Sequence, residues 1–271
     1  MATLPFLRTR DNRLRLLAVL TVTFLALVLF REPIPQDPAY HDFADQRMLV
    51  GIPHALNVIS NLPLALAGIF GLLVIGRSVR RTDSTSFVTP ADSIPYALLF
   101  VALSLTAVGS SYYHLAPDTP RLFWDRLPMS VAFMAYLGAA INERIDRRTG
   151  LVALVPLVAC GMLSVLYWRA TELAGFGDLR YYVLVQSYPT LFVLLMVLLL
   201  PSSYTHGRML VTVTALYLLT RLVEVGDGFI FGLGHFVSGH TLKHLLTAVA
   251  AWWIIRMLQL RKPHPHNPST A

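Results

Sequence analysis

Five residues in two distant stretches of the chain have types and spacings that suit hydrolytic chemistry. Ser110 and His114 stand four residues apart, and Asp125 follows them across a loop that contains two prolines. Far downstream, His240 and His244 are again four residues apart. Because residues four apart share one face of an α-helix, each pair can present two side chains to a single site.

The three histidines are a plausible ligand set for one metal ion. His240 and His244 can bind an ion from one helix face, and His114 from a second helix completes a three-histidine set. Zinc with three protein ligands keeps its fourth position for water, whose pKa falls to about 7. Asp125 could then serve as general base, and Ser110 could donate a hydrogen bond to the developing oxyanion.

Simpler roles are open for single residues of this set. His114 alone could make an interhelical hydrogen bond, and Asp125 could be the N-cap of a helix, where aspartate is favoured. A nucleophilic role for Ser110 is disfavoured, because the histidines are better suited as ligands than as bases. The five residues together favour a functional site, since ionisable residues within membrane segments usually mark function.

Composition places the chain among membrane proteins. It has 271 residues, of which 55% are hydrophobic and 14% are charged, whereas a soluble domain carries roughly 25% charged residues. The net charge of +7 comes from short basic clusters between apolar runs, a pattern typical of orientation signals and of contacts with anionic lipid headgroups. Nucleic acid is therefore not an expected partner.

Apolar segments long enough to approach a membrane span recur along the chain. A spanning helix needs about 20 mostly apolar residues, and the first segment is expected to be retained because no small-residue cleavage pattern follows it. We expect an all-α polytopic bundle with eight segments, near residues 14–30, 55–76, 94–115, 126–142, 151–168, 181–200, 208–226 and 239–260.

Lysine and arginine counts predict the orientation of these segments. The basic residues concentrate in the N-terminal arm, in alternate loops such as the one with Arg77, Arg80 and Arg81, and in the tail. By the positive-inside rule both termini are cytoplasmic. This topology places His114, Asp125 and the other two histidines toward the same non-cytoplasmic face, as a single site requires.

Other polar residues are expected to support the bundle. Asn57, Ser60 and Asn61 share a helix face and would hydrogen-bond across helices. Arg221 and Glu224 are three residues apart and predict an intramembrane ion pair. Lys243 is expected to point off the histidine face and to snorkel to the headgroups. The interfacial aromatic belt is expected to include Tyr112, Tyr113, Trp124 and Trp168.

With these residues in view, the chain resembles the alkaline ceramidase family, within a superfamily of seven-helix membrane hydrolases that includes the adiponectin receptors. The resemblance covers roughly residues 40–260 and rests on residues 57–61, 110–114, Trp124-Asp125, Gly239-His240 and Lys243-His244. It implies a seven-helix domain over residues 39–260, an added N-terminal arm and transmembrane helix over 1–38, and a disordered tail over 261–271. It also implies Zn²⁺ on the three histidines, with Ser110 and Asp125 assisting amide hydrolysis.

The family resemblance also bears on calcium. Asp42 and Asp45 resemble part of the family's calcium loop, but Arg47 and His54 stand where an asparagine and a glutamate are expected. A cationic arginine is unsuited to a site that needs oxygen ligands. We therefore expect a degenerate loop in which Arg47 pairs with Asp42 or Asp45, and no Ca²⁺ requirement.

The leading hypothesis is a zinc-dependent membrane hydrolase that cleaves the amide of a ceramide-like N-acyl lipid. It is expected in a bacterial inner membrane with its site toward the periplasm. Two rivals stay open: a receptor or regulator like the adiponectin receptors, and a structural or lipid-transport bundle with a non-catalytic zinc. The identity of the lipid and the oligomeric state are left open.

Overall fold

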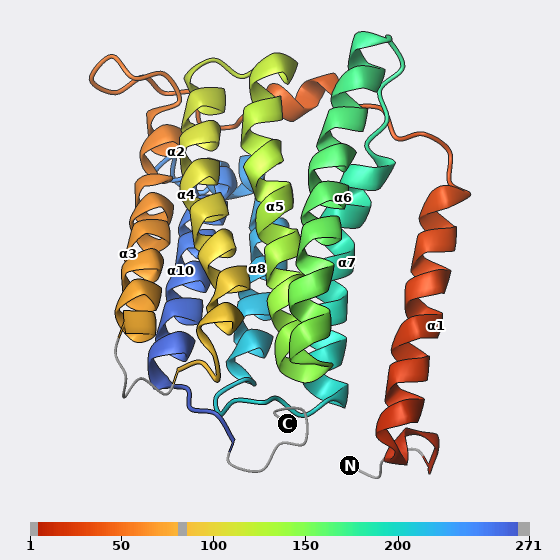
Figure 1. The fold of residues 1–271 in the computed structure, drawn as a ribbon. Helices are drawn as coiled ribbons and strands as arrows, with labels where there is room; N and C mark the ends of the chain where they lie inside the picture. The colour runs from red at the N-terminus through yellow and green to blue at the C-terminus, as the bar shows by residue number, and fades with distance from the viewer. Residues whose placement is uncertain (1–4, 81–85, 265–271) are drawn as a thin grey trace.

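The protein is built from helices that run up and down a single bundle (Figure 1). A computed structural model describes residues 5–80 and 86–264, and these form no β-strand beyond two isolated bridges. Short 3₁₀ helices cover Pro5–Arg8 (η1), Pro38–His41 (η2) and Pro90–Ser93 (η3). The α-helices are α1 (Arg10–Leu29), α2 (Ala55–Ile59), α3 (Leu62–Arg80), α4 (Ile94–Leu115), α5 (Thr119–Arg144), α6 (Arg147–Leu173), α7 (Arg180–Leu199), α8 (Met209–Val225), α9 (Asp227–Gly232) and α10 (Gly239–Leu260).

Every expected apolar segment falls on a helix or a pair of helices, which confirms the all-α prediction. Within the described residues, five helical stretches are long and apolar enough to cross a membrane: α1, Ala55–Arg80, Pro90–Leu115, α6 and α7. Of the remaining long helices, α8 has only 17 residues, while α5 and α10 carry ionisable side chains in their buried surfaces. Arg81 and residues 265–271, part of the expected disordered tail, lie outside the described residues.

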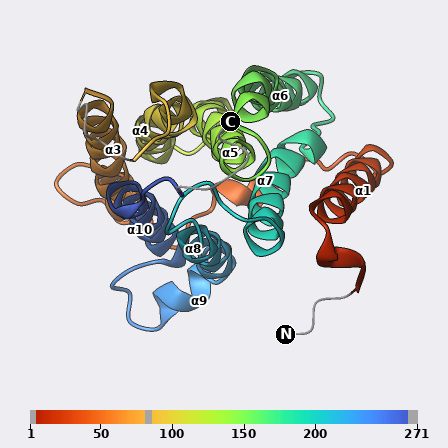
Figure 2. The ribbon, with the colours of Figure 1, turned by 60° about the horizontal axis from the view of Figure 1, so that its bottom comes forward.

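The arrangement of the helices separates one of them from the rest. Helices α3, α4, α5, α8 and α10 pack against one another, and α6 and α7 complete the bundle beside α5. Helix α1 stands at the edge and packs mainly on α7 (Figures 1 and 2). Leu17 is its one buried residue, whereas α4 and α5 bury much of their length. The apolar surface of α1 therefore suits contact with lipid.

Helix α5 begins earlier than the sequence suggested. Asp118 is its N-cap and accepts a hydrogen bond of 2.7 Å from the backbone N–H of Arg121. Aspartate at the N-cap followed by Pro120 in the first turn is a strong start signal. The alternative that Asp125 caps this helix is therefore wrong, because Asp125 lies inside α5 with its side chain buried.

Two of the four residues expected in the interfacial aromatic belt lie in the interior instead. Tyr112 and Trp124 are exposed, as expected of a belt, but Tyr113 and Trp168 are fully buried. The Tyr113 hydroxyl lies 2.8 Å from Nδ1 of His41, and the Trp168 indole donates a hydrogen bond to Glu172. Both aromatic residues therefore help to build the interior at the end of the bundle where η2 lies.

Candidate metal centre

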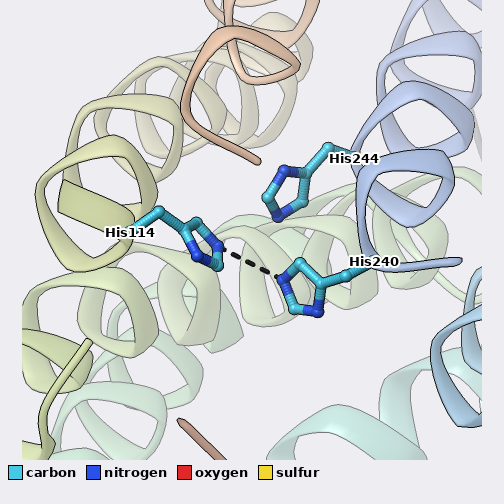
Figure 3. Close-up of side chains that lie close together, drawn as sticks. All are labelled: His114, His240 and His244. Atoms are coloured by element: carbon cyan, nitrogen blue, oxygen red, sulfur yellow. Dashed lines mark hydrogen bonds between the residues drawn. The ribbon is translucent and has the colours of Figure 1, made fainter. Parts of the chain in front are cut away.

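Three histidine side chains meet near one end of the bundle. His114 comes from α4, and His240 and His244 come from the first turns of α10; their rings point toward one another (Figure 3). All three are buried, and one ring nitrogen from each lies within 4.8 Å of the others. The structure therefore brings together the three histidines that the sequence selected, in a group that could hold a metal ion.

The distances within this group suit a metal site. Nε2 of His114 and Nε2 of His240 are 3.2 Å apart, and tetrahedral nitrogen ligands bound at about 2.0–2.1 Å are roughly 3.3 Å apart. Nδ1 of His114 is buried and has no hydrogen-bond partner among the described residues. Nε2 of His114, which faces His240, is therefore the nitrogen available to an ion, and Nδ1 lacks the outer partner that ligand histidines normally have.

The third histidine is oriented by residues of α2 and its flank. Nδ1 of His244 lies 2.9 Å from the Ser60 hydroxyl and 3.1 Å from the Asn57 carbonyl oxygen. The Asn57 side-chain oxygen also accepts a 2.7 Å hydrogen bond from Thr241. These contacts confirm the predicted cross-helix role of Asn57 and Ser60, and they leave Nε2 of His244 free for an ion, as outer partners of metal ligands do. Asn61 instead bonds back to Asn57.

The start of α10 is held in place by the end of α8 and by α9. Asp227 accepts a 2.7 Å hydrogen bond from the backbone N–H of His240 and one of 2.9 Å from that of Ala44. A Cβ on Gly239 would lie 2.0 Å from the Val223 carbonyl oxygen, so only glycine allows this approach. Asp227 was not predicted as a site residue, because its role depends on a loop that the sequence does not place.

Phe43 covers the histidines from the loop side. Its ring centroid lies 4.4 Å from that of His240 and 4.7 Å from that of His114. Phe43 is itself buried, and the backbone next to it is tied to Asp227. The group is thus closed off on the side of residues 42–47.

Ser110 and Asp125 lie together beside the histidine group. A Cβ on Gly109 would lie 2.1 Å from the Trp124 carbonyl oxygen, so this glycine lets α4 and α5 touch through their backbones. That contact brings Ser110 and Asp125 together in the wall of one cavity. Both side chains are buried, and Oδ1 of Asp125 has no hydrogen-bond partner in the described chain.

A cavity of about 150 Å³ joins these residues to the interior of the bundle. Its wall includes Ser110, Asp125 and His244 at one end and reaches Ile254 on α10. Lys243, also in the wall, is eleven residues before Ile254, which corresponds to about 16 Å along a helix. The deep part is mainly apolar and includes Leu64, Leu99, Leu103, Ala251 and Ile254. Pockets that bind small molecules are typically apolar with a few polar groups, and this cavity has that composition.

Charged side chains gather at the polar end of the cavity. Arg221 and Glu224 form the predicted ion pair. Lys243 does not snorkel to the surface as expected, because its ammonium lies 2.8 Å from Glu224 and lines the cavity. A buried carboxylate attracts a nearby ammonium more strongly than a distant headgroup does, so Lys243 turns inward.

Arg126 was missed by the sequence analysis. It is 4% exposed, and its guanidinium carbon lies 4.3 Å from the Trp168 ring centroid, 4.9 Å from that of Tyr182 and 5.1 Å from that of Tyr40. Such an aromatic cage stabilises a cation through the negative ring faces. No spacing rule could have revealed it, because the three rings come from three separate segments.

The expected calcium-like loop contains an internal ion pair. Arg47 donates to both carboxylate oxygens of Asp45, at 2.8 and 2.7 Å, and Asp45 is 2% exposed. These hydrogen bonds from Arg47 hold the pKa of the Asp45 carboxyl below its usual range. Arg47 also bonds to the backbone of His235 and Phe236, while Asp42 is exposed. The predicted pairing of Arg47 is thus found, with Asp45 as its partner.

Comparison with known proteins does not assign this chain to a family. No protein-family model matches the chain, and no curated protein is significantly similar to it. What can be inferred about function therefore rests on the residues and their geometry.

Proposed function

We propose that this protein is a membrane hydrolase that uses a zinc ion to cleave the amide bond of an N-acyl lipid. The observation that carries the proposal is the meeting of three buried histidines, an unpaired carboxyl oxygen and an apolar cavity at one place. A structural zinc site is normally closed by a fourth protein ligand. Here the histidine group has no fourth histidine, cysteine or carboxylate ligand within the described residues.

Zinc is the ion that best fits the donors. Three neutral imidazoles suit zinc, copper, iron or nickel rather than calcium or magnesium, and a three-histidine set with a free position is a common catalytic zinc arrangement. When bound, zinc supplies Lewis acidity that polarises a carbonyl oxygen and makes water acidic enough to react near neutral pH. Calcium is not part of the proposal, because Arg47 already neutralises Asp45.

The chain's own residues supply the remaining chemistry. Asp125 accepts a proton from the attacking water, whose oxygen bonds to the amide carbonyl carbon. Ser110 donates a hydrogen bond to the carbonyl oxygen as negative charge develops there. Asp125 then returns the proton to the amide nitrogen, and the C–N bond breaks. The products are a fatty acid and a free amine, and the acyl chain occupies the apolar depth of the cavity.

The proposal includes the family and the topology. We propose an alkaline ceramidase-like domain of seven spanning units, with α1 as an added helix outside it; the peripheral position of α1 supports this division (Figure 2). Both termini are proposed to be cytoplasmic in a bacterial inner membrane, which puts the metal end on the periplasmic side. The start of α1 and the end of α10 lie at the same end of the bundle (Figure 1).

The proposal is tested on detergent-purified protein by metal analysis and by hydrolysis of N-acyl lipids. Asp125→Asn should retain about one zinc per chain and lose about 10²–10⁴-fold in turnover, the usual contribution of a general base. Asp11→Asn, an exposed residue of α1, is the matched control and should not change turnover. Zinc binding without cleavage of any amide or ester lipid would favour a receptor, transport or structural role instead.

A further inference from the structure

Positive charge exceeds negative charge around the polar end of the cavity. Arg221, Glu224, Lys243 and Asp125 all line it. Arg126 stands directly behind two lining tyrosines and interacts electrostatically with both carboxylates. The cavity wall therefore carries two cations and two carboxylates, and Arg126 adds a third positive charge behind the wall. The positive excess is larger once Asp125 takes up a proton during reaction.

Arg126 adds a buried positive charge directly behind the cavity wall. Its Nε and NH1 groups are buried and have no hydrogen-bond partner in the described chain. The aromatic rings of Tyr40, Trp168 and Tyr182 stabilise its charge but accept no conventional hydrogen bond through their faces. Because Arg126 stands outside the cavity wall, it acts on a ligand in the cavity through its charge rather than through a hydrogen bond.

Lys243 and Arg221 also have N–H donors beyond those that contact Glu224. Lys243 has three N–H donors and Arg221 has five. Within residues 5–80 and 86–264, each pairs with a single side chain, Glu224. Glu224 holds both at the cavity wall; Lys243 has 14% of its side chain exposed and Arg221 has 46%. Because Lys243 is mostly buried, its charge favours an anion over a neutral group, and the half-exposed Arg221 adds a weaker contribution of the same sign.

We propose, as an extension of the hydrolase function above, that the preferred substrate carries an anionic group, a carboxylate or a phosphate, on the amine side of its amide. The acyl chain lies in the apolar depth between Leu64 and Ile254, and the amide lies at Ser110 and Asp125. The part of the lipid beyond the nitrogen then lies beside Arg221 and Lys243. A ceramide, whose headgroup is neutral, is a poorer substrate than an acidic N-acyl lipid.

Matched lipids test the headgroup preference without any mutation. N-palmitoylethanolamine is neutral, N-palmitoylglycine has a carboxylate in place of its CH₂OH group, and the phosphate ester of N-palmitoylethanolamine adds a phosphate. The zinc-loaded wild type should cleave at least one anionic lipid with kcat/KM at least about tenfold above the neutral one, which corresponds to about 1.4 kcal/mol. The better of the two anions identifies the headgroup. Equal rates on all three, or a preference for the neutral lipid or for ceramide, would overturn the inference and leave the hydrolase function standing.

Variants of the cavity wall test which residues cause the preference for an anionic lipid. Arg221→Met and Lys243→Met should each reduce the ratio of kcat/KM for the anionic lipid to kcat/KM for the neutral lipid at least severalfold, through KM for the anionic lipid; zinc content is measured in the same samples. Arg256→Met, an exposed arginine of α10 outside the cavity wall, is the control and should keep the full preference. A preference that survives both cavity variants contradicts the assignment. If zinc-loaded protein cleaves none of the lipids, the hydrolase function fails, and thermal shift with the same lipids still tests anion selectivity.

Discussion

Two buried polar clusters lie at opposite ends of the same three helices, α4, α5 and α10. At one end Glu143 pairs with Arg261, and the Tyr96 hydroxyl donates a 2.8 Å hydrogen bond to Glu143. At the other end are the three histidines and Asp125, which forms no ion pair in the described part of the chain. Both clusters are removed from solvent, so burial alone does not distinguish them.

The two clusters differ in whether their charges form an ion pair and in whether they border the cavity. Arg261 is enclosed by the rings of Tyr204, Phe87 and Tyr96, at 4.2, 4.4 and 5.0 Å, and Glu143 and Arg261 lie outside the cavity wall. The histidine end instead borders the cavity, and neither its histidines nor Asp125 form an ion pair within the described residues. Both ends contain buried atoms without a hydrogen-bond partner in the described chain, on Glu143 and Arg261 at one and on His114 and Asp125 at the other. A buried charge with its counter-charge holds helices together, whereas unpaired donors and acceptors beside a cavity are available for ligands.

The largest effect is expected from a histidine ligand. His240→Ala should reduce bound zinc from about one per chain to a trace and abolish lipid hydrolysis, because only two ligands remain. Metal analysis after dialysis and a turnover assay measure both. His206→Ala, an exposed histidine outside the group, should leave both unchanged. Full zinc occupancy in His240→Ala would show that the histidines are not the ligand set.

The paired cluster should respond in stability and not in metal binding. Arg261→Met leaves Glu143 buried without its cation, which typically costs about 3–5 kcal/mol. Equilibrium unfolding in mixed micelles should show this loss, and the double variant with Glu143→Gln should recover part of it. Zinc stoichiometry of the folded fraction should stay at the wild-type value. Loss of zinc without loss of stability would contradict the division between the two clusters.

A smaller effect is expected from the outer partner of His244. Ser60→Ala removes the hydroxyl at 2.9 Å from Nδ1, and loss of such a partner typically weakens metal affinity about 10–100-fold. Competition with a chelator measures the change. Ser187→Ala removes a hydroxyl that bonds only to its own helix at Val183 and should not alter zinc affinity. An unchanged affinity in Ser60→Ala would mean that this contact does not orient the ligand.

The smallest effect concerns the Asp45–Arg47 pair over the metal end. Because the folded-state pKa of Asp45 is lowered, the pair stabilises the fold fully above the unfolded carboxyl pKa of about 3.9 and loses that contribution as pH falls through the lower folded value. The Tm difference between wild type and Arg47→Met should be constant above about pH 5 and shrink below about pH 4. Arg256→Met should show no such pH dependence, and a difference that grows in acid would refute the pairing.

The sequence by itself determined the all-helical class, the positions of the long helices and the three histidines that could hold a metal ion. Apolar runs of near-spanning length, together with few charges, allowed the long helices to be predicted, because helix formation in an apolar environment depends on local composition. The i, i+4 spacing placed His240 and His244 on one face, and the i, i+3 spacing predicted the Arg221–Glu224 pair. These properties are local, so they can be read along the chain.

Only the tertiary structure decided what depends on contacts between distant segments. Gly109 matters because Trp124 comes within 2.1 Å of where a Cβ would be, and Lys243 turns inward because Glu224 of α8 is beside it. The Arg126 cage needs rings from η2, α6 and α7. Each of these depends on how the helices pack, and packing is set by many weak contacts summed over the whole bundle rather than by any local pattern.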